Sequence, residues 1–424
     1  MSFSWNMSHL PFLSDKDRTL LLITMRSWFC KEPIDVSGLN NPDLFWEYTV
    51  RHGLSGILGS MVLNNLLNHP GINSRAVDWY RSHLLQHEQS LHVCRRVEQE
   101  AQLAGIPIVF VKGPAIALQA YTQEPGVRSY SDIDVLVPSR EEALRLIRTL
   151  TGKEAEVPEE IRWDRLMHPG RLHIMLRDWE VEFAHPMDPS PDPMFDFIRM
   201  HQNQLFKIPG PEVPFTVPDV SLHMIFLIQH MVRHLCNRLI WYMDLAVLHL
   251  AHEKDLDWDF ISHELEKLEL KNMASLISLF CIQQVNPAFP RIPFGKKGWN
   301  TAFQKIVVSP EQIHSTLSLH HESRVLHYYT RILSTLRYVL IADPHPQTSL
   351  FRRLPCHWLS VRLVHSQGWK SSFWIPFFQA LFVGIYICLF PIVWLLCYSF
   401  VGIFLAEKSF LKSRRNDAQI LLSG

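Results

Sequence analysis

Residues 106–137 read IPIVFVKGPAIALQAYTQEPGVRSYSDIDVLV, and the rest of the chain is organised around this stretch. Two apolar, β-branched runs flank a short segment of helical character. In the second run, residues 131–137, strand periodicity places Asp132, Asp134 and Leu136 on one face. Two aspartates are therefore predicted to lie side by side at the end of a strand.

Two neighbouring carboxylates are unusual in a core strand. Burial disfavours each charge, and the two like charges repel each other. A divalent cation would resolve this conflict, since Mg²⁺ prefers oxygen ligands and completes its shell with water and substrate phosphates. The alternative is that Asp132 and Asp134 lie on the solvated face of an edge strand, because D-x-D alone is a weak motif.

The residues upstream have the features of a phosphate site. A strand over 108–111 leads to a turn at Lys112 and Gly113, and the proline that follows suits the first turn of a helix. Exposed N–H groups at a helix start, next to a glycine and a lysine, favour a bound phosphate. Arg128 adds a second cation, and we assign it together with Ser131 to substrate binding.

The order of an apolar strand, KGP, a helix, a tyrosine, an arginine and SDIDVLV resembles the uncharacterised bacterial nucleotidyltransferase family of the DNA polymerase β-like superfamily. The resemblance implies that the glycine-containing turn grips nucleotide phosphates and that D-x-D binds two catalytic Mg²⁺ ions. Lys112 and Gly113 stand where most members of the superfamily have Gly-Ser, and Asp132 and Asp134 match the metal aspartates. It also implies an α+β fold with a small mixed sheet between helical regions.

Transfer of a nucleotide needs a third carboxylate, either as a metal ligand or as a base. The runs RLHIML and WEVEF predict a strand pair, with Glu180 and Glu182 on one face of the second strand. Glu182 is our choice, and Glu180 is the alternative. Related sequences carry a histidine two places after the acidic residue, whereas His185 comes one place later and is only a weak candidate.

Helices are expected on both sides of this core. Ser14 and Asn41 are predicted N-caps, and a long helix over 76–104 is expected to stop at Gly105. We assign this N-terminal region to scaffolding. Eight prolines between 186 and 218 predict a loop or linker.

After the linker, residues 220–251 are predicted to form one central helix, followed by further helices over 255–342. Four polar or aromatic side chains line up along one face of the central helix: His230, His234, Arg238 and Trp241. The stripe either faces the nucleotide, with His234 and Arg238 binding substrate, or is a solvated surface. The resemblance favours the first interpretation, since the family has a similar arrangement here.

A membrane segment is predicted near the C-terminus. From Phe373 to Ala406 there are 34 residues without a charged side chain, more than the approximately 20 needed to cross a bilayer. Two arrangements of this segment fit the sequence: a single kinked helix, and a re-entrant pair of helices broken near Pro391. The expected division of the chain is a helical region 1–104, a nucleotidyltransferase core 105–190, a linker 191–218, a helical domain 219–345, a linker 346–372, the membrane segment 373–406 and a basic tail 407–424.

The net charge and the cysteine content of the chain restrict its partners and its compartment. The chain has 424 residues and a formal net charge of zero, so long nucleic acid is not an expected partner. Seven scattered cysteines and an N-terminus without a secretory signal favour a reducing compartment, the cytoplasm.

The sequence therefore predicts a membrane-anchored, Mg²⁺-dependent enzyme at the bacterial inner membrane that moves an NMP from an NTP to an unidentified acceptor. The alternatives are a catalytically inactive nucleotide-binding or scaffold protein, and a toxin-like nucleotidyltransferase acting on tRNA or protein.

Overall fold

A computed structural model describes residues 14–152, 171–184, 205–208, 214–233, 236, 238–268 and 270–293. All of them belong to the first of two compact units, Met1–Gln347. His185, His234 and the predicted membrane segment lie outside the described residues. Among the helices in the described ranges, none combines the length and the apolar character that crossing a bilayer requires.

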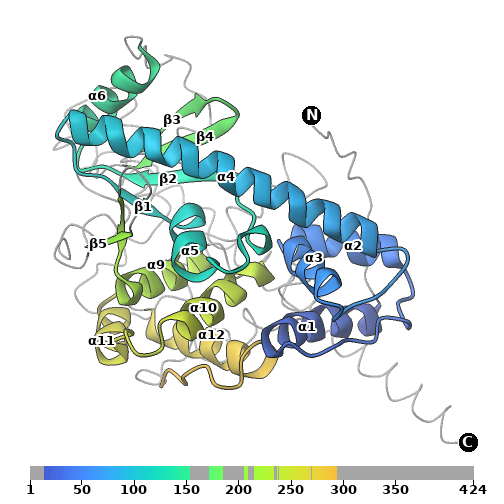
Figure 1. Cartoon of the computed structure of the whole chain (residues 1–424). Coiled ribbons are helices and arrows are strands. Elements are labelled where there is room, and N and C mark those ends of the chain that lie inside the picture. The colour runs from blue at the N-terminus through green and yellow to red at the C-terminus, as the bar shows by residue number, and fades with distance from the viewer. Residues whose placement is uncertain are drawn as a thin grey trace, which may run out of the picture. The chain divides into compact units, whose positions relative to one another are not determined.

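The N-terminal helices begin where the sequence predicts. Ser14 accepts a hydrogen bond from the N–H of Asp17 (3.1 Å) at the start of one helix, and Asn41 accepts one from the N–H of Leu44 (3.0 Å) at the start of the next. A further helix between residues 55 and 63 was not predicted. The helices, visible in Figure 1, are α1 (Asp15–Cys30), α2 (Pro42–Arg51), α3 (Ser55–Leu63) and α4 (Asn73–Leu103).

A mixed four-stranded sheet follows, in the order β1-β2-β4-β3. Strand β2 pairs antiparallel with β1 and parallel with β4, and β3 pairs antiparallel with β4. The strands are β1 (Val109–Val111), β2 (Asp132–Leu136), β3 (Arg171–Leu176) and β4 (Trp179–Ala184). Between β1 and β2 lie the helix α5 (Gly113–Ala120) and the 3₁₀ turn η1 (Pro125–Val127). The α+β core predicted from the sequence is confirmed.

The two faces of the sheet have different surroundings. Ile133 and Val135 of β2 and Phe183 of β4 are buried in one apolar cluster with residues of α4 and α6 (Arg140–Thr151). Helix α6 starts as predicted, because Ser139 accepts a hydrogen bond from the N–H of Glu142 (3.2 Å). The alternating residues of β2 and β4, which include the carboxylates, therefore point to the opposite face.

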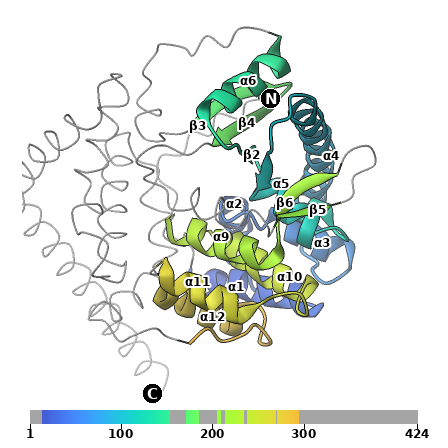
Figure 2. The ribbon, with the colours of Figure 1, turned by 90° about the vertical axis from the view of Figure 1, so that its left-hand side faces the viewer.

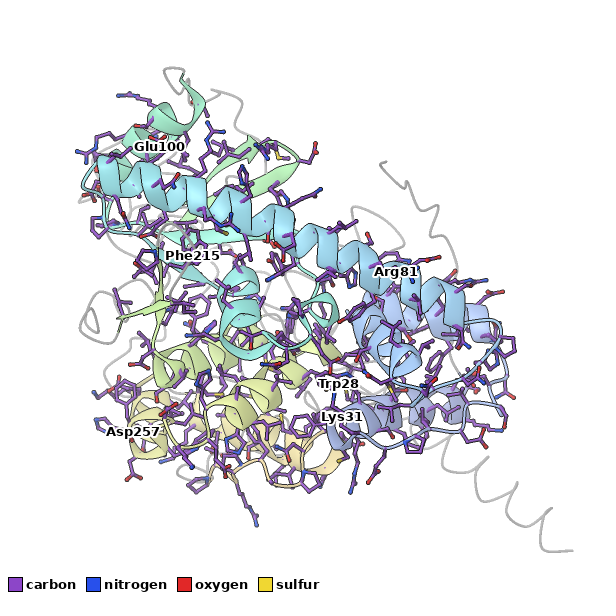
Figure 3. The ribbon with its side chains drawn as sticks, in the orientation of Figure 1. Trp28, Lys31, Arg81, Glu100, Phe215 and Asp257 are labelled. Carbon is purple, nitrogen blue, oxygen red and sulfur yellow. The ribbon has the colours of Figure 1, made fainter. Side chains whose placement is uncertain are left out.

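The proline-rich segment contains structure that the sequence analysis missed. Two antiparallel strands, β5 (Leu205–Ile208) and β6 (Phe215–Pro218), fall within the predicted linker. Both strands are labelled in Figure 2, and Gln119 of α5 donates a hydrogen bond to the backbone carbonyl of Pro218 in β6 (2.7 Å). The ring of Phe215, labelled in Figure 3, packs edge-on against Phe110 of β1, with centroids 5.8 Å apart. Burial of Phe215 and Val217 explains the difference, because proline-free runs between the prolines can still supply apolar side chains to the core.

The predicted single helix over 220–251 is wrong. It is two helices, α9 (Val220–Arg233) and α10 (Leu239–Ala251), with Cys236 at a positive φ of 55° between them. No glycine or proline signals this break, and its cause is tertiary. His52 accepts hydrogen bonds from the backbone N–H groups of Leu239 (3.3 Å) and Ile240 (3.1 Å), so α10 starts anew against the end of α2.

Two further helices cover the sequence that follows. They are α11 (Trp258–Lys267) and α12 (Lys271–Gln284), as predicted for this part of the second helical region. With α9 and α10 they pack into the larger apolar cluster, which also contains α1, α2, α3 and Val109 and Val111 of β1. Figure 2 shows α9, α10, α11 and α12 together on one side of the sheet.

Candidate active site

The central strands place four carboxylates on one face of the sheet. In the register of β2 and β4, Asp132 is paired with Glu180 and Asp134 with Glu182. Asp134 is 3% exposed and Glu182 is 8% exposed, whereas Glu180 is open to solvent. Because the pairing is parallel and in step, paired residues project to the same side of the sheet. Glu182 is thus the buried acidic neighbour of Asp134.

The charge of Asp132 is disfavoured where it lies. Burial and the nearby charge of Asp134 raise the pKa of Asp132, and Lys112 offsets this only in part. The hydroxyl of Ser131 donates a hydrogen bond to Oδ1 of the adjacent Asp132 (3.3 Å). The pair therefore favours a cation or a proton in its vicinity.

Lys112 comes to the same face from β1. Its Nζ forms an ion pair with Asp134 Oδ1, and both side chains are largely buried. The contact follows from strand pairing, since Val111 is the register partner of Asp134 and Lys112 is the next residue. Lys112 has φ 55° and ψ −123°, a conformation that residues with a side chain rarely adopt.

Gly113 lies against Tyr130, a residue that the sequence analysis did not single out. A Cβ on Gly113 would come within 2.8 Å of Tyr130 Cβ and Cγ, so only glycine fits. Tyr130 is held by α4, because its hydroxyl contacts His87 Nδ1 (3.1 Å) and Ser90 Oγ. The N-terminal region therefore supports the turn directly. Nothing in the local pattern of α4 indicated this, since the contact spans about forty residues of sequence.

Arg128 is committed to a buried network. Its Nε donates to Asp244 Oδ1 (2.8 Å), which also accepts from the hydroxyl of Tyr121 (3.0 Å), and its Nη1 donates to the carbonyl of Ser129. Burial is the largest effect and alone would lower the pKa of Arg128, but the charge of Asp244, the hydrogen bond to it and the nearby Tyr121 together outweigh burial, so the pKa is raised. Burial also raises the pKa of Asp244, against the effect of Arg128.

Sequence reasoning missed the role of Asp244. The available signal was a carboxylate in the middle of an otherwise apolar helix, where an unpaired charge is very unfavourable. Its second oxygen, Oδ2, has no hydrogen-bond partner among the described residues.

Arg238 is the cation at the start of α10. Its guanidinium lies over the ring of Trp241 (5.8 Å), and His230 of α9 meets the same ring edge-on (5.0 Å). Desolvation and the nearby Arg128 lower the pKa of Arg238, while the charge of Asp132 raises it. Three of the four residues in the predicted stripe therefore lie together, and Arg238 among them is near Asp132, although the predicted single helix is broken.

The donor chemistry on this face fits a divalent metal ion. Asp132 and Asp134 are hard oxygen donors whose mutual repulsion a cation would relieve, and Mg²⁺ commonly takes only one or two protein carboxylates. In the described part of the chain, no three histidine, cysteine or acidic side chains are gathered closely enough to hold an ion by themselves. Water and phosphate would have to supply the remaining ligands.

Comparison with protein families gives a match over the region of the site. The model of a family described as uncharacterised nucleotidyltransferase matches residues 39–285, which is more than half of the chain. The match includes the whole carboxylate face, Lys112 and Gly113, Arg128 and the start of α10. No curated protein matches the chain.

Proposed function

The chain belongs to the uncharacterised nucleotidyltransferase family, and from this premise we propose that it transfers an NMP from an NTP to an acceptor, with Mg²⁺ at Asp132 and Asp134. A new bond forms between the acceptor oxygen and the α-phosphorus, the bond from that phosphorus to the bridging oxygen breaks, and pyrophosphate leaves. Mg²⁺, when bound, supplies charge stabilisation on the attacking and leaving oxygens.

The observation that carries the proposal is the register of β2 and β4. It pairs Asp134 with Glu182 on one face, and Asp132 with Glu180 as the neighbouring pair on the same face. In the proposed reaction Asp132 and Asp134 hold the metal, water and phosphate complete its shell, and Glu182 accepts the proton of the acceptor hydroxyl. The burial of Glu182 and the exposure of Glu180 support Glu182 in this role.

Cations near both aspartates support binding of a triphosphate. Lys112, at the start of α5, pairs with Asp134, and Arg238 is near Asp132. A phosphate chain between them would meet donors with charge complementary to its own. Arg128 is held by Asp244, and we assign it as a positioning residue whose charge reaches the site from a fixed place.

Membrane attachment through residues 373–406 and catalysis in the cytoplasm are part of the same proposal. They rest on the uncharged run in the sequence. Fractionation of cells that express the full chain and a chain ending at residue 372 tests the attachment. The full chain is expected in the membrane pellet after a carbonate wash and the shorter chain in the supernatant. Recovery of both in the supernatant contradicts it.

The transfer itself is tested with NTP carrying a label on either the α- or the γ-phosphate. The purified full-length protein is incubated with cell lysate, Mg²⁺ and labelled NTP, and the labelled product is identified by mass spectrometry. Label is expected to move to the acceptor from the α-position and to leave as pyrophosphate from the γ-position. Transfer of γ-label to the acceptor would contradict nucleotidyl transfer.

Two variants make this test specific. Asp132→Asn is expected to abolish transfer, while the metal-free fold stays at least as stable, because it removes one of two repelling charges. Asp178→Asn makes the same chemical change in the exposed turn between β3 and β4 and should transfer like the wild type. Mg²⁺-dependent NTP binding without any transfer would instead indicate the inactive nucleotide-binding alternative. Growth arrest on expression that Asp134→Asn relieves would indicate the toxin-like one.

A further inference from the structure

Lys112 and Asp134 form an ion pair in a largely water-excluded place. The side chains of Lys112 and Asp134 are 18% and 5% exposed, and the ammonium contacts Oδ1 directly. Charge pairs with little solvent around them interact much more strongly than pairs at the surface. The ammonium is therefore a substantial part of what makes Asp134 tolerable as a buried anion.

The backbone at Lys112 shows that this cation is held against a conformational preference. With φ 55° and ψ −123°, the residue lies where a side chain is disfavoured and glycine is not. A glycine would make the turn from β1 into α5 without strain. The presence of lysine at a strained position next to a carboxylate indicates that its ammonium is used.

The ammonium also contacts one of the two carboxylate oxygens of a proposed metal ligand. Asp134 offers two carboxylate oxygens on the face that it shares with Asp132, and Lys112 contacts Oδ1. A divalent cation bound between the aspartates would have this positive charge as a close neighbour, and like charges repel. Phosphate oxygens arriving with the metal would give the ammonium an alternative partner.

We propose that Lys112 is the counter-cation of Asp134 in the free enzyme and that it moves to the phosphates of the incoming nucleotide, so that divalent metal and nucleotide bind cooperatively. This inference rests on the proposed function. It makes metal binding without nucleotide weak, and it makes each ligand strengthen the other by the same factor.

The test measures binding of Mn²⁺ by electron paramagnetic resonance and calorimetry, with and without a non-hydrolysable NTP analogue. In the wild type, the analogue is expected to tighten Mn²⁺ binding by about fivefold or more. Lys112→Met should bind Mn²⁺ about fivefold tighter than the wild type without nucleotide, and should lose most of the coupling. Equal or weaker Mn²⁺ binding by Lys112→Met without nucleotide overturns the proposal, as does a wild type that binds no Mn²⁺ even with the analogue present.

Two further substitutions at position 112 separate charge from strain. Lys112→Gly removes both the ammonium and the disfavoured conformation. It should therefore match Lys112→Met in Mn²⁺ binding and unfold at a higher temperature than Lys112→Met. If Lys112→Met does not fold, Lys112→Gly takes its place in the binding test. Lys112→Arg keeps a cation and should retain coupling close to that of the wild type. Loss of coupling in Lys112→Arg to the level of Lys112→Met counts against a role for the charge.

A matched control is available on α11. Lys267 pairs through Nζ with Oε1 of the buried Glu264 (2.6 Å), also an ammonium against a buried carboxylate, but away from the sheet. Lys267→Met should leave Mn²⁺ binding and coupling unchanged. Failure of this inference is distinct from failure of the proposed function. If the wild type transfers the nucleotide but Lys112→Met keeps the wild-type coupling between Mn²⁺ and the analogue, only the role of Lys112 is overturned. If the wild type shows the coupling but transfers no nucleotide, only the reaction is overturned.

Discussion

The guanidinium of Arg128 donates a hydrogen bond from Nε to Oδ1 of Asp244 over 2.8 Å, and so ties the segment before β2 to the middle of α10. Both side chains are buried, and Asp244 also accepts the hydroxyl of Tyr121. The carboxylate face and the start of α10 therefore have a fixed relationship, on which the placement of Arg238 near Asp132 depends.

Asp244→Ala should lower the free energy of unfolding by about 3 kcal/mol or more, because it leaves the charge of Arg128 buried without its partner. Tyr121→Phe, which removes one neutral donor, should lower it by about 1 kcal/mol. Urea unfolding followed by circular dichroism measures both. Replacing the pair together, as Arg128→Met with Asp244→Leu, should be less damaging than Asp244→Ala; a double variant that is more damaging would contradict this account.

Gly113→Ala should disturb the phosphate turn. Its φ is not in the left-handed region, so the damage comes from contact, since the added Cβ would come within 2.8 Å of Tyr130. We expect a loss of about 1 to 3 kcal/mol in stability and a weaker affinity for the NTP analogue. Calorimetry and thermal unfolding measure the two effects.

Gly105→Ala is the control for this substitution. Gly105 has a φ of +66° and open space around it, so alanine should lower the stability by about 1 to 2 kcal/mol without changing nucleotide affinity. A drop in affinity equal to that of Gly113→Ala would show that general loss of stability is responsible.

Arg238→Ala should weaken binding of the NTP analogue by roughly tenfold or more, because a charged hydrogen-bond donor to phosphate is lost. The midpoint of thermal unfolding should change little, since Arg238 is accessible to solvent. Arg81→Ala, an exposed arginine on α4 labelled in Figure 3, is the control and should bind like the wild type. Unchanged affinity in Arg238→Ala would remove Arg238 from the proposed site.

His223 should contribute to acid sensitivity. It is fully buried and contacts Oε1 of Gln119, and burial lowers the pKa of His223 to about 3. Because the unfolded chain binds this proton near the ordinary value of 6.5 and the folded chain does not, stability falls as pH drops from 6.5 towards 3. In His223→Gln, the loss of unfolding free energy between pH 7 and pH 4 should be smaller than in the wild type. An identical pH dependence would show that His223 does not titrate on unfolding.

Local signals in the sequence predicted most of the elements and the face of the carboxylates. The caps at Ser14, Asn41 and Ser139 act within three residues of themselves, so they can be recognised without knowledge of the fold. The alternation around Asp132 and Asp134 likewise needs only the period of a strand. The resemblance to the family rests on residues from β1 through β2, and the family match over residues 39–285 confirms it.

Tertiary structure alone decided which distant groups meet. The register that pairs Asp134 with Glu182 and the salt bridge from Arg128 to Asp244 both join residues that are far apart in the chain. The end of α9 near Cys236 has no local signal in the sequence. His52 made the last of these possible by accepting the first N–H groups of α10. Hydrogen bonds and periodicity within a few residues are encoded locally, whereas burial and charge pairing depend on which surfaces the folded chain brings together.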